Sequence, residues 1–175
     1  LGGTLGAAST LGWLNPAQAQ SVLRFGMIAG FTGPVSALTQ ESADGARLCF
    51  EAVNAQGGVR GQQLELVALD DKYDAALTAQ HGKNLAAQGV LAFMLPRGTA
   101  QSEALVPIAT QARMALIAPV SGAMSLRYPV QPNVFNLRAS FQLEAERAVR
   151  HLAQTGVKRI TIIKSNDVFG TDAGM

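Results

Sequence analysis

The sequence has few of the residues on which catalysis, metal binding and nucleic-acid recognition usually depend. It contains one cysteine and two histidines in 175 residues, and aromatic residues make up 6%. Cys49 therefore has no partner for an internal disulfide, and neither His81 nor His151 has a second ligand at metal-binding spacing. The formal net charge of +2 is mild, and no basic stripe with interleaved aromatics occurs. These features argue against a nucleic-acid partner and a metal site.

The common catalytic motifs are also missing. No G-x-S-x-G surrounds Ser121, and neither G-x-G-x-x-G nor a Walker loop is present. Asp70 and Asp71 end an apolar run as a catalytic carboxylate pair might, but Lys72 follows them and no acid or base partner can be identified. The sequence predicts a protein that is not an enzyme and needs no cofactor.

The first 20 residues carry no charge and are rich in small and apolar residues. Residues 17–19 read Ala-Gln-Ala, which is typical of a signal-peptidase site, so residues 1–19 are interpreted as a signal peptide cut after Ala19. No Met or basic segment precedes it, and the true start is therefore expected to be missing. The alternative is a short hydrophobic helix. Cys49 lies far from the cleavage site, so we expect a periplasmic protein without a lipid anchor.

Residues 24–71 contain the pattern of a βαβ unit. An apolar run at 25–29 ends in a loop with Gly30, Gly33 and Pro34, and a helical pattern then leads to Gly57-Gly58 and a second apolar run at 64–69. Within the helix, Cys49 is predicted to be buried with its apolar neighbours. Ligands of parallel sheets bind outside the carboxyl ends of the strands, where the first loop lies.

The alternation of strands and helices continues to the end of the chain. Asp74 is a candidate N-cap for a helix reaching about Gln88, and a continuous apolar run at 90–95 is typical of a strand buried on both faces. Further strands are expected at 115–118, 134–137 and 159–164, with helices around 105–112 and at 142–154. The predicted fold class is α/β, a doubly wound parallel sheet.

The order of these elements and their junctions resembles the type 1 periplasmic binding proteins of ABC transporters, in particular the leucine/isoleucine/valine-binding family. The resemblance covers residues 22–174. The segments on which it is based are Gly33-Pro34, Asp44 to Leu48, Asn54 to Gly61, Asp70-Asp71, Pro119-Val120-Ser121, Phe135 to Arg138 and Asp167 to Gly170.

The resemblance implies two lobes joined by a hinge, with a ligand held in the cleft between them. Residues 22–137 would form a nearly complete first lobe, and residues 138–175 would form the hinge crossover and the beginning of a truncated second lobe. It also implies a solute-binding protein that is a monomer when complete, captures a small amino acid or carboxylate and delivers it to an ABC permease in the inner membrane.

Two loops match the family positions that hold a ligand carboxylate. We expect Thr99 and Ser121 to donate hydrogen bonds from their hydroxyls, and Gly98 and Gly122 to let the ligand approach the backbone. Helix N-termini following such loops favour an anion. The alternative is that Thr99 and Ser121 act only as helix caps.

Arg97 and Phe169 complete the candidate site. The Arg97 guanidinium suits a carboxylate, and the alternative is a solvated loop charge. Phe169 matches a family position where an aromatic from the second lobe packs on the ligand, and the alternative is that it packs against the base of its own helix. Gly122 stands where branched-chain binders usually have a hydroxyl for the α-amine, and 140–143 lacks an acidic residue. These departures favour an organic or aromatic carboxylate over leucine.

Other functions fit the same pattern. A sensory or regulatory receptor module of the same fold would bind a ligand without a transporter, and a truncated remnant would have no function. Neighbouring permease genes, or a signalling domain beyond residue 175, would distinguish the first two. Turnover by the purified protein would instead indicate an enzyme.

Overall fold

The computed structural model describes residues 22–174, so the expected signal peptide at 1–19 lies outside the described residues. The chain forms a five-stranded parallel sheet with the order β2-β1-β3-β4-β5. The strands are β1 (Val22–Ala29), β2 (Gln63–Asp70), β3 (Ala92–Met94), β4 (Ala115–Ile117) and β5 (Val134–Phe135). This confirms the predicted α/β fold class, and the last three strands are shorter than the apolar runs that predict them.

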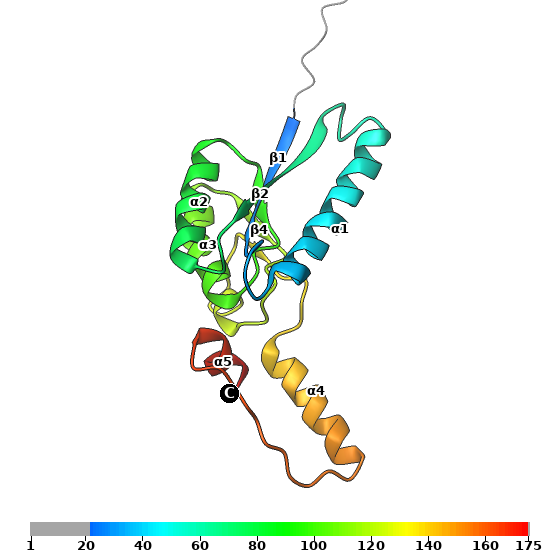
Figure 1. The fold of residues 1–175 in the computed structure, drawn as a ribbon, viewed down its shortest axis with the longest axis vertical. Coiled ribbons are helices and arrows are strands. Elements are labelled where there is room, and N and C mark those ends of the chain that lie inside the picture. Colours follow the sequence, from blue (N-terminus) through cyan, green and yellow to red (C-terminus); the bar gives the residue numbers. More distant parts are fainter. Residues whose placement is uncertain (1–21, 175) are drawn as a thin grey trace, which may run out of the picture.

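Helices cover both faces of the sheet (Figure 1). Helix α1 (Ser36–Ala55) lies on one face, and α2 (Ala75–Ala87) and α3 (Thr99–Gln111) lie side by side on the other. The 3₁₀ turn η1 (Met124–Leu126) follows β4, and α4 (Phe141–Gln154) and α5 (Val168–Ala173) complete the chain. The doubly wound arrangement explains why a continuous apolar run predicts each inner strand correctly.

The alternation along β1 shows how both faces are filled. Met27 and Ala29 pack with Ala43 of α1, whereas Ile28 points to the opposite core with Leu85 and other apolar residues of α2 and α3. Successive side chains of a strand face opposite sides, and both sides are buried here. The sheet is therefore held firmly, and its carboxyl edge is a rigid base for the loops that follow.

Two expectations are wrong. Cys49 is exposed, because the buried stripe of α1 passes through Thr39, Ala43 and Ala46 and leaves Cys49 beside it. The expected strand at 159–164 is absent, and residues 157–165 form an exposed irregular segment in which Ile163 is 96% exposed. No strand of the described chain lies beside this segment, and β structure needs a hydrogen-bonded neighbour.

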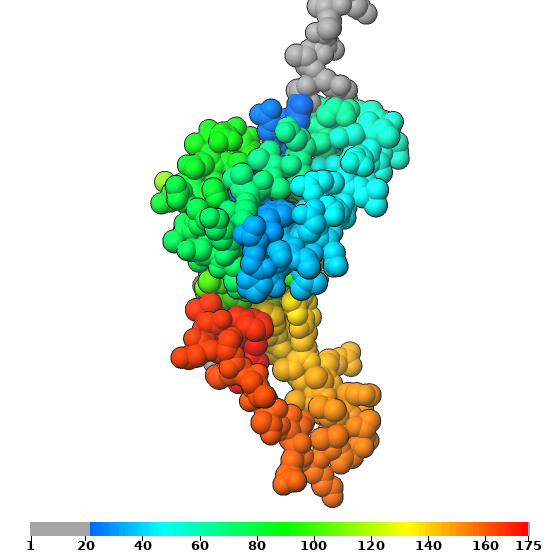
Figure 2. Space-filling model, viewed as in Figure 1, coloured from blue at the N-terminus to red at the C-terminus, as the bar shows by residue number. Residues whose placement is uncertain are grey.

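The helix expected from Asp74 is confirmed, since the Asp74 carboxylate accepts from the N–H groups of Ala76 and Leu77. The helix expected at 142–154 is α4, of which only Phe141 is buried. Figure 2 shows α4 and the irregular segment after it projecting from the body made by the sheet and α1–α3, whereas α5 lies against that body. The division into lobes at residue 137 stays a prediction.

Candidate functional site

The carboxyl edge of the sheet carries unusual backbone conformations. Tyr73, Leu95 and Ala118 follow β2, β3 and β4, and their φ angles are +63°, +54° and +52°. Positive φ is uncommon for residues other than glycine and often marks functional positions. These three loops face the same end of the molecule, where α5 lies (Figure 1).

The loops after β3 and β4 are joined to each other. Val120 N–H donates to the carbonyl of Pro96 at 2.8 Å, and the hydroxyl oxygens of Thr99 and Ser121 are 2.9 Å apart. Both side chains are buried, Thr99 at 4% and Ser121 at 1% exposure. The structure thus brings together the two hydroxyls that the sequence singles out from residues 22 positions apart.

This hydroxyl pair has one hydrogen to spare. A single O–H···O bond joins the oxygens, so one of the two hydroxyl hydrogens remains available whichever residue donates. Ala123 N–H also donates to the Ser121 oxygen, at 3.2 Å. Ser121 can then accept from Ala123 and donate to Thr99, which leaves the Thr99 hydrogen free for another acceptor.

The N-terminus of α3 begins beside this pair. Gly98 is its N-cap with φ +108°, and no side chain of the described residues caps the helix. A Cβ at Gly98 would lie 2.1 Å from Oε1 of Gln101 and 3.0 Å from the Tyr73 ring. Glycine is therefore required here, and the uncapped first N–H groups of α3 favour an anion.

A cavity of about 420 Å³ opens at this helix end. We call it the α2–α3–α5 pocket, because the N-terminal ends of these three helices line it. Its lining residues are Tyr73, Asp74, Ala75, Thr99, Ala100, Gln101, Asp167, Val168 and Phe169. The volume falls in the range of small-molecule sites. Of the predicted site residues, Thr99 and Phe169 line it directly, and Gly98 and Ser121 support its wall.

Two carboxylates border the pocket, and sequence reasoning did not find them as site residues. Asp74 caps α2, and Asp167 accepts from Gly170 N–H and from the Ser165 hydroxyl, each at 2.7 Å. The hydrogen bond from Gly170 lowers the pKa of Asp167. The sequence indicates Asp74 only as a helix cap and Asp167 only as part of the family resemblance, and the fold brings both to one cavity.

Phe169 lines the candidate pocket, and its contact with a ligand stays a prediction. The residue is 44% exposed and lines the pocket, and its ring contacts the Phe141 ring edge-on with 5.1 Å between centroids. Phe141 therefore supports the Phe169 side chain, which remains partly exposed where it lines the cavity.

Arg97 and Gly122 lie outside the pocket lining. The Arg97 guanidinium donates to the Leu38 carbonyl and to the Ser42 hydroxyl, both at 3.0 Å, and burial lowers its pKa. Gly122 lies against the crossover, where a Cβ would come within 2.7 Å of Phe141 N and 2.9 Å of the Ala139 carbonyl oxygen. Arg97 thus bonds the loop after β3 to α1. The absence of a side chain at Gly122 leaves room for the backbone of the crossover at Ala139 and Phe141. Ligand contact by either residue stays a prediction.

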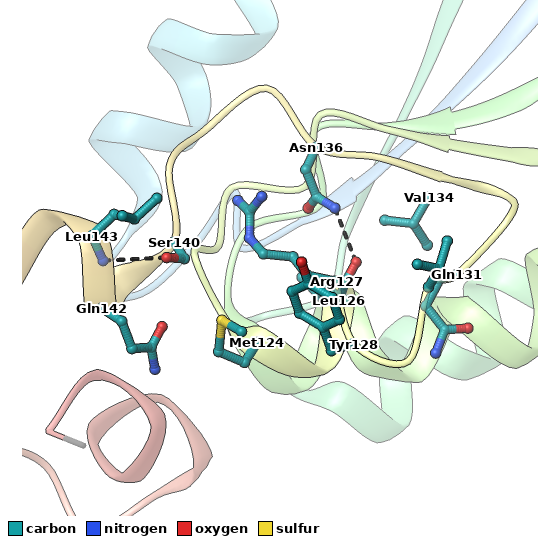
Figure 3. A pocket seen from close by; sticks show the side chains of 11 residues that line it. Met124, Leu126, Arg127, Tyr128, Gln131, Val134, Asn136, Ser140, Gln142 and Leu143 are labelled. Atoms are coloured by element: carbon teal, nitrogen blue, oxygen red, sulfur yellow. Dashed lines mark hydrogen bonds between the residues drawn. The ribbon is translucent and has the colours of Figure 1, made fainter.

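A second cavity, of about 500 Å³, lies beyond η1 (Figure 3). Met124, Leu126, Val134 and Leu143 give it an apolar lining, and Arg127 and Asn136 add polar groups. None of the six predicted site residues lines it. We place the candidate site in the α2–α3–α5 pocket because the hydroxyl pair and the uncapped helix end converge there.

Neither a metal site nor a membrane span is found between residues 22 and 174. No group of three or more His, Cys, Asp or Glu side chains in this range could hold a metal ion. No helix in it has both the length and the apolar character needed to cross a membrane.

Comparison with known proteins gives consistent results. A family model described as periplasmic binding protein matches residues 22–174. The Leu/Ile/Val-binding protein BraC3 of Rhizobium johnstonii is 21% identical over 153 residues, which cover 87% of this chain and 42% of the relative.

Solved structures share the fold. A possible leucine/isoleucine/valine-binding protein from Rhodopirellula baltica matches with a TM-score of 0.83 and 32% identity, over 88% of this chain and 42% of that one. An ABC transporter substrate-binding protein from Desulfitobacterium hafniense in complex with Leu matches with a TM-score of 0.75 and 25% identity, over 88% and 45%. The chain thus spans less than half the length of these relatives.

Proposed function

Because the chain belongs to the periplasmic binding protein family, we propose that it is the solute-binding part of an ABC importer and binds a small carboxylate in the α2–α3–α5 pocket. The ligand class is an amino acid or an organic or aromatic acid. The bound solute would be delivered from the periplasm to a permease in the inner membrane. We expect binding without turnover.

One observation carries the proposal: the uncapped N-terminus of α3 and the spare hydroxyl hydrogen of the Thr99–Ser121 pair meet at the same cavity. A carboxylate offers acceptors to both, and the helix dipole favours its charge. Phe169 and Tyr73 provide aromatic surface for an apolar side chain. The pocket thus offers separate polar and apolar surfaces, as small-solute sites do.

The α-amine is the point on which the two ligand classes differ. Gly122 supplies no hydroxyl for it, which favours an acid without an amine. Asp74 and Asp167, in contrast, place carboxylates at the pocket, and these favour an amino acid as the second candidate. The relative from D. hafniense was crystallised with Leu.

Matched ligand pairs test the proposal by calorimetry on the purified chain. L-Leucine and 4-methylpentanoate differ only in the α-amino group, as do L-phenylalanine and 3-phenylpropionate. Binding of the deaminated member at equal or higher affinity supports an organic-acid site, whereas loss of binding without the amine supports an amino-acid site. Four ligands that all fail to bind would contradict the proposed carboxylate site in this chain.

Thr99→Val tests the role of the hydroxyl. We expect affinity for the carboxylate that binds to fall by about tenfold, the factor for one lost hydrogen bond of ordinary strength. Thr110→Val is the matched control, because Thr110 is an exposed residue at the other end of α3. Equal affinities for the two variants would contradict a ligand contact by Thr99.

A receptor of the same fold would bind the same ligand but signal to a different partner.

Arg97→Ala distinguishes the two readings of Arg97: a weaker carboxylate affinity indicates ligand contact, and an unchanged affinity with lower stability indicates that its bonds to α1 are its whole role.

A further inference from the structure

Helix α5 reaches the loop that carries Ser121 through one side chain. The Asp172 carboxylate accepts from Met124 N–H at 3.0 Å. Met124 opens η1, and the preceding residue, Ala123, donates its N–H to the Ser121 hydroxyl oxygen. Asp172 is therefore bound to the backbone of the same loop that positions half of the hydroxyl pair.

Asp172 also contacts the start of α4. The side-chain amide of Gln142 donates to the Asp172 carbonyl at 2.8 Å and lies 3.4 Å from its carboxylate. Figure 3 shows Gln142 pointing from α4 toward α5, with Met124 close by. Three segments meet at this residue: the loop after β4, the start of α4, and α5 itself.

These contacts fix the aromatic wall of the α2–α3–α5 pocket. Phe169 precedes Asp172 by three residues on α5, so the two side chains lie on one helix face. Ala173 adds a small apolar contact with the cluster of Ala123, Leu126 and Phe141. The hydrogen bond from Met124 N–H to the Asp172 carboxylate is charge-assisted, and such bonds are stronger than those between neutral groups.

We propose that Asp172 is a positioning residue that fastens α5 to the Ser121 loop and thereby keeps Phe169 over the pocket. It touches no ligand. The part of this inference that concerns ligand affinity rests on the proposed function, whereas the fastening itself does not.

The experiment compares the whole chain with three variants. Asp172→Ala removes the acceptor of Met124 N–H, Asp172→Asn keeps an oxygen for it, and Thr171→Ala is the matched control at an exposed residue of the same helix. Amide hydrogen exchange by NMR is measured at Met124 and along α5. The dissociation rates of L-leucine and 4-methylpentanoate are measured in parallel.

We expect Asp172→Ala to exchange the Met124 amide about tenfold faster and to release the bound probe about tenfold faster, as loss of one strong hydrogen bond predicts. Asp172→Asn should recover most of both rates, and Thr171→Ala should change neither. Unchanged exchange at Met124 in Asp172→Ala overturns the fastening. Faster exchange with an unaltered dissociation rate overturns the positioning role. If the unmodified chain binds neither probe, the proposed function fails for these ligands, and the exchange rates still decide the fastening.

Discussion

The Thr99–Ser121 pair predicts a measurable coupling between two residues in different loops. Their hydroxyl oxygens are 2.9 Å apart and both side chains are almost fully buried. Ser121→Ala leaves the Thr99 hydroxyl and Ala123 N–H without their partner, so we expect it to lower the free energy of unfolding by about 2 kcal/mol. Thr99→Val leaves Ser121 still bonded to Ala123, and its expected cost is about 1 kcal/mol.

The double variant should cost less than the sum of the two. Once Ser121 is alanine, the bond between the hydroxyls is already lost, and valine at 99 removes a buried hydroxyl that has no partner. We therefore expect about 2 kcal/mol for the double variant and a coupling energy of about 1 kcal/mol. Valine replaces threonine at nearly equal volume and similar helix propensity, so the cycle isolates the hydroxyl.

Urea unfolding at 25 °C measures all four proteins. The midpoint should shift while the slope with urea concentration stays constant, which shows that the surface exposed on unfolding has not changed. If the losses from the single variants add to within about 0.3 kcal/mol, the limit for independent sites, the two loops are not joined through these hydroxyls. The proposed contact between the Thr99 hydroxyl and a ligand would then lose the hydrogen-bond arrangement on which it rests.

Three further predictions concern the same edge of the sheet. Gly98→Ala should lower the free energy of unfolding by about 1–3 kcal/mol, because φ is +108° and the new Cβ would meet Gln101; Gly89→Ala, with positive φ but nothing within 4 Å, should cost less in the same urea assay. Asp74→Ala should cost about 1 kcal/mol through loss of its two capping bonds, and Asp74→Asn should restore most of it; equal losses would contradict the cap. Burial raises the pKa of Asp71, although the hydrogen bonds from Thr78 and Tyr73 act to lower it. The contribution of Asp71 to stability is therefore complete below its unfolded pKa and is lost as pH rises through its folded pKa. Asp71→Asn should therefore gain stability relative to the unmodified chain as pH rises from below the unfolded pKa to above the raised folded pKa, and a pH-independent difference would contradict the raised pKa.

The sheet could be predicted because its physical requirements are local. Each inner strand is buried on both faces, so an uninterrupted apolar run indicates it without knowledge of its neighbours. The cap at Asp74 is equally local, since it bonds to N–H groups two and three residues away. Thr99 and Ser121 were found through a family resemblance, and their direct contact was not foreseen.

The errors arise where burial depends on distant parts of the chain. The stripe of α1 was identified correctly through Ala43 and Ala46, but Cys49 lies one position before Phe50, about 100° around the helix from it. The run at 159–164 has the composition of a strand, and composition does not supply a hydrogen-bonded neighbour. Asp172 gave no signal at all, because its carboxylate accepts from Met124 N–H, 48 positions away in the sequence.

The pocket combines parts that are held by unequal numbers of buried contacts. Thr99 and Ser121 follow β3 and β4, which belong to a sheet that is covered on both faces, whereas Phe169 belongs to a six-residue helix. Local opening is easiest where few buried contacts resist it. Ligand binding at such a site would order α5 far more than the sheet, so the affinity of the pocket would depend on how firmly Asp172 and Phe141 hold that helix. If the pocket binds the proposed carboxylate, we expect the loops to set where it is bound and the contacts of α5 to set how long it stays.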